Sequence, residues 1–158
     1  MARVYLETSF ISACVSDRSD IGSVYRREVS LAWWNHEGPR HRLFASDEVV
    51  TELSDRRFAR SDAAMALIAD VPIIGVTADM VALAEALVRA KAMPRPVAGD
   101  ALHVAMATVP EMEYMLTWNV RHLANPNNVE HVTGVCREFG LVPPRILRPD
   151  DMMEMNDE

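Results

Sequence analysis

Apolar and polar positions follow two different periods along this chain. Short runs of apolar and β-branched residues predict buried strands, at Arg3–Glu7, His41–Ala45, Val71–Val76, Glu113–Trp118 and Arg145–Leu147. Apolar residues three or four apart predict helices, at 8–14, 23–36, 46–53, 61–69, 79–92, 99–108 and 129–138. Strands that alternate with helices predict an α/β fold, in which a mostly parallel sheet is flanked by helices on both faces.

Capping and breaking residues set the expected boundaries. Thr8 with Ser9, Ser46 and Thr77 each stand at the start of a predicted helix, where a side-chain oxygen can accept a free backbone N–H. The chain after Pro149 is acidic and methionine-rich and lacks the apolar spacing of a packed element. We therefore expect one domain over residues 1–149 and an acidic, partly disordered tail at 150–158.

The composition is that of an ordinary globular domain. The 158 residues are 49% hydrophobic and 25% charged, which is enough for a single core. No apolar run is long enough to span a bilayer, and Glu7 interrupts the first apolar stretch before it resembles a signal peptide. Cys14 and Cys136 are isolated, without zinc-site spacing. These features predict a reduced, cytoplasmic protein with no membrane partner.

The net charge of -7 argues against a nucleic-acid partner only until its distribution is considered. Five acids follow Arg148, and without them the rest of the chain carries about -2. Lys91 is the only lysine, so nearly all positive charge is arginine, whose planar fork suits phosphate oxygens. Clusters lie at Arg26–Arg27, Arg40–Arg42 and 56–60. Taken singly, each cluster is also typical of a solvated surface.

Three separated acids and one amide stand where an α/β sheet would bring them to one edge. Glu7 ends the first strand, Glu52 lies in the helix after the second, Asp100 opens a helix, and Asn119 follows a later strand. Ligands in open α/β sheets bind beyond the carboxyl ends of the strands. Clustered carboxylates repel one another unless a cation lies among them, and hard cations such as Mg²⁺ and Mn²⁺ prefer oxygen ligands.

Each of these residues also has a purely structural interpretation. Asp100 in a first helical turn complements the helix dipole, and Asn119 is a common turn former. His103 lies one turn after Asp100 and is more typical of a hydrogen-bonded core histidine than of a ligand. Glu7 is the hardest to explain in this way, because an acid directly after a buried strand is costly without a partner.

Four segments together resemble the acidic motifs of PIN domains, most closely the VapC-like toxins. They are Leu-Glu-Thr-Ser, Val-Val-Thr-Glu-Leu, Gly-Asp-Ala-Leu-His-Val-Ala-Met-Ala and Leu-Thr-Trp-Asn, and they occur in the family's order across the whole chain. The resemblance implies a PIN-like three-layer sandwich and a Mg²⁺- or Mn²⁺-dependent endoribonuclease. It also implies an antitoxin partner, an RNA substrate and a homodimer.

By that resemblance Glu7, Glu52 and Asp100 hold the metal, and Asn119 takes the fourth catalytic position. Ser9 matches the small hydroxyl residue that supports the site, and we expect Ser9 and Thr8 to contact the substrate. Two departures stand out, because the family usually has Asp at the first position, and Asn119 offers a neutral oxygen instead of a carboxylate.

These departures favour one alternative, a weakly active or inactive PIN-fold module that binds RNA or protein. A phosphatase or receiver-like domain would need an Asp nucleophile where Glu7 stands, which argues against that class. The Trp33–Trp34 pair suggests self-association or partner binding, although large aromatic residues of this kind are commonly core residues.

Overall fold

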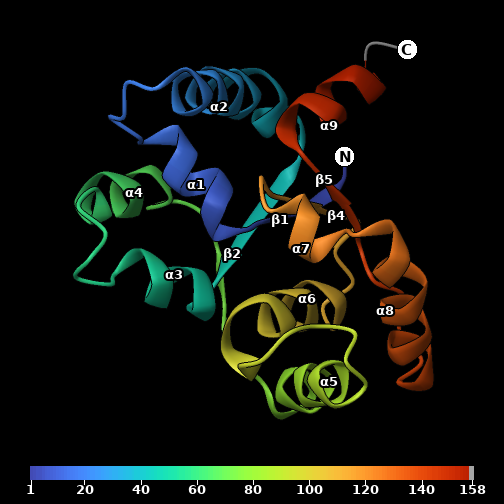
Figure 1. The fold of residues 1–158 in the computed structure, drawn as a ribbon. Helices are drawn as coiled ribbons and strands as arrows, with labels where there is room; N and C mark the ends of the chain where they lie inside the picture. Colours follow the sequence, from blue (N-terminus) through green and yellow to red (C-terminus); the bar gives the residue numbers. More distant parts are fainter. Residues whose placement is uncertain (157–158) are drawn as a thin grey trace.

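A parallel sheet lies at the centre of the molecule, and β1 is its middle strand (Figure 1). The computed structural model describes residues 1–156. In this part of the chain five strands pair in the order β3-β2-β1-β4-β5, and every pairing is parallel. The strands are β1 (Arg3–Leu6), β2 (Arg42–Ser46), β3 (Ile73–Ile74), β4 (Tyr114–Leu116) and β5 (Arg145–Leu147). Their carboxyl ends therefore share one edge of the sheet.

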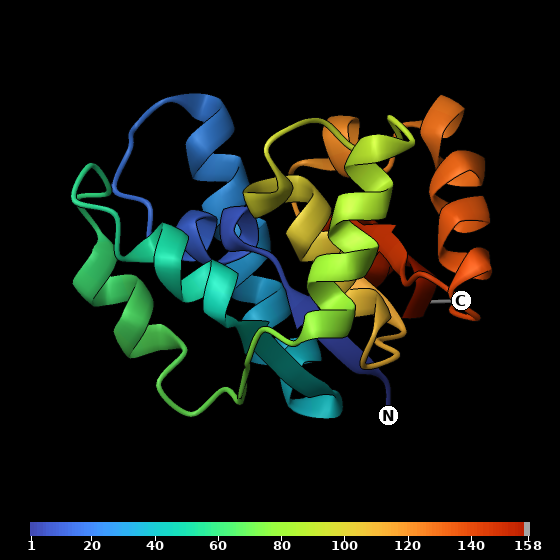
Figure 2. The ribbon, with the colours of Figure 1, turned by 90° about the horizontal axis from the view of Figure 1, so that it is seen from below.

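Helices cover both faces of this sheet, so the predicted three-layer α/β sandwich is confirmed (Figures 1 and 2). One group consists of α1 (Thr8–Cys14), α2 (Ile21–Ala32), α3 (Asp47–Leu53), α4 (Ser61–Leu67) and α9 (Pro149–Asn156). The other includes α5 (Ala78–Arg89), α6 (Leu102–Thr108) and α8 (Pro126–Glu138). Shorter turns are η1 (Trp33–Glu37), η2 (Gly38–Arg40), η3 (Val97–Ala101) and α7 (Val120–Leu123). Within residues 1–156, no helix combines the length and the apolar character needed to cross a membrane.

The core is built around β1 and α6. Val4, Tyr5 and Leu6 of β1 are inaccessible to solvent, and every residue of α6 is buried. Trp33 is also fully buried and Trp34 is half-buried against the core, which confirms the core interpretation of this pair. Because β1 lies between two strands and between two helix layers, the side chains at its carboxyl end start from a rigid support.

Local capping chemistry explains most helix starts. Ser46 Oγ accepts from Val49 N at 3.2 Å, and Thr77 Oγ1 accepts from Met80 N at 3.3 Å, so both predicted caps are confirmed. The predicted cap at Thr8 and Ser9 is wrong. Glu7 is the N-cap of α1, and its carboxylate accepts the Ser9 N–H at 2.7 Å. A charged acceptor at this position takes the backbone N–H that the hydroxyls were expected to bind.

Three boundaries differ from the sequence prediction for identifiable reasons. The strand predicted at 71–76 is only Ile73–Ile74, because Val71 N bonds to Ile68 O and Val76 N bonds to the Asp47 carboxylate. The helix predicted from 129 starts at Pro126, since Asn125 caps it and proline suits the first helical position. The predicted loop at 17–22 ends at Asp20, which caps α2.

The predicted disorder after Pro149 is contradicted by α9, which packs on α2 and η1. Met152 is 2% exposed within the core. Tyr25 Oη donates to Asp150 Oδ2 at 3.0 Å, and Asp150 also pairs with Arg148. Buried Met152 and the anchored Asp150, together with Met153 packed against the core, hold a helix that has little apolar periodicity. Residues 157–158 of the predicted tail lie outside the described residues.

Substitution of Met152 tests whether α9 is part of the folded core. Met152→Ala should lower the free energy of unfolding by about 2–4 kcal/mol, because it removes a buried side chain and leaves a cavity. Urea unfolding followed by circular dichroism measures the change. The control Glu154→Ala alters an exposed position of the same helix and should change stability by less than about 0.5 kcal/mol. Equal stability of Met152→Ala and the parent would mean that α9 does not contribute to the core.

Candidate functional site

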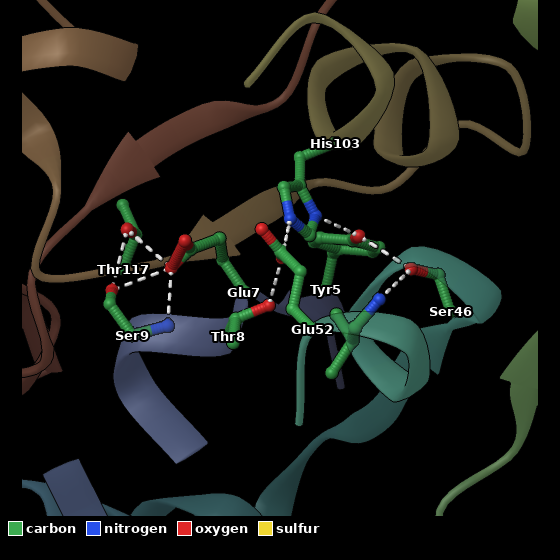
Figure 3. Close-up of polar contacts among 9 residues, drawn as sticks. Tyr5, Glu7, Thr8, Ser9, Ser46, Glu52, His103 and Thr117 are labelled. Atoms are coloured by element: carbon green, nitrogen blue, oxygen red, sulfur yellow. Dashed lines mark hydrogen bonds and ion pairs between the residues drawn. The ribbon is translucent and has the colours of Figure 1, made fainter. Parts of the chain in front are cut away.

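Glu7 is a buried carboxylate held by one of its two oxygens. It is 5% exposed, and its Oε2 accepts from Ser9 N, from Ser9 Oγ at 2.5 Å and from Thr117 Oγ1 at 3.0 Å (Figure 3). Both hydroxyls are oriented by the backbone, since Ser9 Oγ accepts from Trp118 N and Thr117 Oγ1 accepts from Asn119 N. No hydrogen bond within the described residues reaches Oε1. Glu7 is therefore fixed in place with one oxygen available to a ligand.

Glu52 is held in the same one-sided manner from α3. Its Oε1 accepts from Thr8 Oγ1 at 2.5 Å and contacts His103 Nε2 at 2.5 Å, and no hydrogen bond of the described residues reaches Oε2. Thr8 is the residue after Glu7, so the two carboxylates are brought to the same edge of the sheet, beside His103 (Figure 3).

A buried chain of hydrogen bonds fixes His103 from behind. Its Nδ1 lies 2.6 Å from Tyr5 Oη, which lies 2.8 Å from Ser46 Oγ. His103 is 1% exposed and Tyr5 is fully buried, so the interpretation of His103 as a hydrogen-bonded core histidine is confirmed. This chain links β1, the end of β2 and α6, and it orients the ring toward Glu52.

The electrostatics of the site favour a charged His103–Glu52 pair. Burial alone would lower the pKa of His103, but the hydrogen bond to Glu52 and the charges of Glu7, Glu52 and Glu48 outweigh it, so the pKa is raised. Burial would raise the pKa of Glu52, but its hydrogen bonds with His103 and Thr8 leave it lowered. Burial raises the pKa of Tyr5, so its hydroxyl stays protonated.

Glu48 is a member of this site that the sequence prediction missed. It lies one turn before Glu52 on α3 and is half-buried. Burial and the Glu52 charge raise its pKa, while His103 and the Gly99 backbone N–H act in the opposite direction. Gly99 directly precedes Asp100. The Glu48 side chain therefore connects α3 with the start of the η3–α6 segment. The i,i+4 spacing of the two glutamates was the available signal in the sequence.

Asp100 and Asn119 lie at the same edge of the sheet, but neither side chain makes a hydrogen bond or ion pair with Glu7 or Glu52 in the described part of the chain. Asp100 is half-buried in η3, and its carboxylate makes no hydrogen bond or ion pair with the described residues. Asn119 begins α7 and is tied to Glu7 through Thr117, whose hydroxyl accepts from Asn119 N and donates to Glu7. Convergence is thus seen for Glu7 and Glu52 and stays a prediction for Asp100 and Asn119.

The available donors suit a hard divalent cation. Within residues 1–156, no three His, Cys, Asp or Glu side chains are grouped closely enough to form a complete metal site. Glu7 and Glu52 nevertheless each present an oxygen without a hydrogen bond from the described residues, and Glu48 adds negative charge beside Glu52. Mg²⁺ and Mn²⁺ prefer such oxygen ligands, and a cation would offset the charge of the buried Glu7.

The fold of this chain has counterparts among proteins of known structure. VapBC2 from Rickettsia felis superposes with a TM-score of 0.56 at 13% identity, over 92% of this chain and 98% of that one. VapC20 from Mycobacterium tuberculosis gives 0.57 at 24% identity, over 77% and 93%. FitAcB from Neisseria gonorrhoeae gives 0.55 at 13% identity, over 92% and 97%. The fold is the PIN-like fold of the VapC toxins.

At these identities the likeness establishes the fold alone. No protein-family model matches the sequence, and no curated protein matches it either. The PIN-like architecture therefore confirms the fold that the four motifs predicted, whereas the roles of the individual side chains rest on the geometry of this chain.

The His103–Glu52 pair predicts a pH-dependent stability of the metal-free protein. A raised His103 pKa contributes stability that is fully present below its ordinary value of 6.5 and is lost as pH rises through the folded-state value. The lowered Glu52 pKa contributes stability that is present above 4.5 and is lost as pH falls through its folded-state value. The pair should therefore stabilise the fold most between pH 4.5 and 6.5.

His103→Gln should cost about 2 kcal/mol near pH 6 in EDTA, because it removes a charge-assisted hydrogen bond. The difference from the parent should shrink above pH 7, and urea unfolding across pH 5–9 measures it. His131→Gln, at an exposed histidine of α8, is the control. A difference that stays constant across this range would show that His103 does not carry a charge in the folded protein.

Proposed function

We propose that this chain is a Mg²⁺- or Mn²⁺-dependent endoribonuclease of the PIN type, acting as the toxin of a toxin–antitoxin pair. The observation that carries the proposal is that Glu7 and Glu52 are fixed by hydrogen bonds in the same way. Each carboxylate is fixed through one oxygen by hydroxyl or imidazole groups, and each leaves its second oxygen without a hydrogen bond from the described residues. A buried carboxylate such as Glu7 that only completed the fold would be expected to use both oxygens in hydrogen bonds.

In this proposal Glu7, Glu52 and Asp100 hold the divalent cation, and Asn119 supplies a neutral oxygen beside them. The cation, when bound, lowers the pKa of a water molecule and offsets charge that develops on the phosphate oxygens. Ser9 and Thr117 hold Glu7, and Thr8 and His103 hold Glu52, so the ligands need little reorganisation. His103 also offsets part of the charge of three nearby glutamates.

RNA is the substrate class that one structural neighbour supports. VapC20 is described as a sarcin–ricin loop cleaving toxin. VapBC2 was solved bound to a DNA fragment from its promoter. By analogy we propose an RNA substrate and a protein antitoxin for this chain, with self-association as a homodimer. The alternative is an inactive binding module, favoured by the neutral Asn119 and by the pairing of Glu52 with His103.

A cleavage assay decides between these functions. The purified chain should cut labelled total RNA with Mn²⁺ or Mg²⁺ and should not cut it in EDTA. Because water is the attacking group, the products should carry no 2′,3′-cyclic phosphate, unlike those of a contaminating metal-independent ribonuclease. Glu85→Gln, at an exposed acid of α5, should cleave at the parent rate. Absence of cleavage with either metal would favour the binding module.

A further inference from the structure

A basic hollow is lined by none of the residues that form the candidate site. It encloses about 590 Å³ between the end of α5, the loop before η3, α7 and the start of α8. Its charged lining consists of Arg89, Lys91, Arg95 and Arg121, and His122 adds a titratable ring. Within residues 1–156 no acid lines it, although the chain as a whole carries -7. This basic hollow therefore concentrates positive charge on an acidic protein.

The cations of the basic hollow are exposed and unpaired. Within residues 1–156, the side chains of Arg89, Lys91, Arg95 and Arg121 make no hydrogen bond or ion pair, and all four are exposed. A second arginine-lined hollow, next to α1 and α2, differs in this respect. There, for example, Arg57 pairs with Asp55 at 2.9 Å, and Arg60 donates to Val15 O. The unpaired charges make the basic hollow the better anion site.

Its position relates it to the candidate catalytic residues. Arg121 follows Asn119 by two residues, so their Cα atoms are at most about 7 Å apart. Arg95 precedes Asp100 by five residues, on the loop that leads into η3. In Figure 2 the loop after α5, α7 and the start of α8 lie along the edge toward which β1 runs. An extended anion in the basic hollow would thus lie along the same edge of the sheet as Asn119 and Asp100.

We propose that this basic hollow binds the phosphodiester backbone of the RNA strand next to the cleaved phosphate. The inference rests on the proposed nuclease function and adds a second contact region for the same substrate. Arginine forks pair well with phosphate oxygens, and such contacts position a strand without reading its sequence. An acidic protein partner would need apolar anchor residues in the hollow as well. Ala92 and Met93 are buried and Val88 is half-buried, so they offer little apolar surface to such a partner.

The single lysine permits a direct footprint. Lys91 is acylated with an amine-reactive ester, with and without a 12-nucleotide single-stranded RNA of mixed sequence, in EDTA so that no metal-dependent cleavage occurs. Peptide mass spectrometry separates Lys91 from the N-terminal amine, which serves as the internal control. We expect RNA to slow Lys91 modification at least 5-fold and to leave the N-terminus unchanged. Equal rates with and without RNA would overturn the proposal.

Charge removal gives an independent test. For single strands the log–log slope of affinity against salt concentration falls by about 0.7 for each phosphate that the protein no longer neutralises. Arg95→Ala with Arg121→Ala should therefore lower the slope by about 1.4 and weaken RNA binding about 25-fold near 0.1 M salt. Arg137→Ala, at an exposed and unpaired arginine in the last turn of α8, should leave affinity and slope unchanged.

The outcomes separate this inference from the proposed function. Binding that depends on the basic hollow without any cleavage would reject the nuclease and keep the contact surface. Cleavage with an unchanged salt slope in the double variant would keep the nuclease and reject the basic hollow. Protection of Lys91 by a 12-residue oligoglutamate but not by RNA would overturn the proposal in favour of an acidic protein partner.

Discussion

Glu7→Gln is expected to lower RNA cleavage at least about 100-fold while the fold is retained. The substitution keeps the shape of the side chain and an oxygen that can accept the Ser9 N–H. It removes the negative charge that would bind the cation, and losses of about 10²–10³ are typical when one electrostatic contact to a transition state is removed. Initial rates on a labelled RNA in Mn²⁺ give the effect, and circular dichroism monitors the fold.

The same variant should not lose stability in EDTA. Glu7 is 5% exposed, and its partners are hydroxyls and one N–H, so the ionised form is desolvated without a direct ion pair. Ser9 and Thr117 hydroxyls can rotate toward the amide of Gln. A variant that cleaves RNA at the parent rate would remove Glu7 from the metal site. A variant that is unfolded would show that the carboxylate is needed as the α1 cap.

Where the sequence prediction succeeds, the determinants are local. Ser46 and Thr77 are recognisable as caps because a cap bonds to residues two or three positions later. The order of strands and helices follows from periodicity, and five residues are enough to predict β1 with its following acid. Glu7 is a candidate for the same reason, since an acid after a buried strand needs a partner wherever the rest of the chain lies.

Several of the features that the prediction misses have determinants distant in sequence. The burial of Met152 depends on α2 and η1, which lie more than a hundred residues earlier. No local pattern of apolar residues therefore predicts α9. The link from Tyr5 to His103 spans 98 positions, and the link from His103 to Glu52 spans 51. The strand at Ile73–Ile74 was shortened by the side chain of Asp47, which intercepts the Val76 N–H.

Asp100→Asn is expected to abolish the stabilisation that Mn²⁺ gives the parent. A ligand that binds only the folded state stabilises it by RT ln(1 + [L]/Kd), which is about 2.7 kcal/mol at a hundredfold excess over Kd. Asp100 makes no hydrogen bond or ion pair with the described residues, and it lies next to Gly99, whose N–H acts on Glu48. Such a free carboxylate can contribute charge to a cation without first breaking an internal bond.

In EDTA, Asp100→Asn should not lower the free energy of unfolding. Removal of one negative charge from a site that also holds Glu7, Glu48 and Glu52 relieves repulsion, so Asp100→Asn should be as stable as the parent or more stable. Asp79→Asn, at an exposed acid in the first turn of α5, is the matched control and should keep the full Mn²⁺ effect. Thermal unfolding with EDTA and with Mn²⁺, together with titration calorimetry, measures both quantities. Equal Mn²⁺ affinity in Asp100→Asn and the parent would mean that Glu7 and Glu52 bind the cation without Asp100.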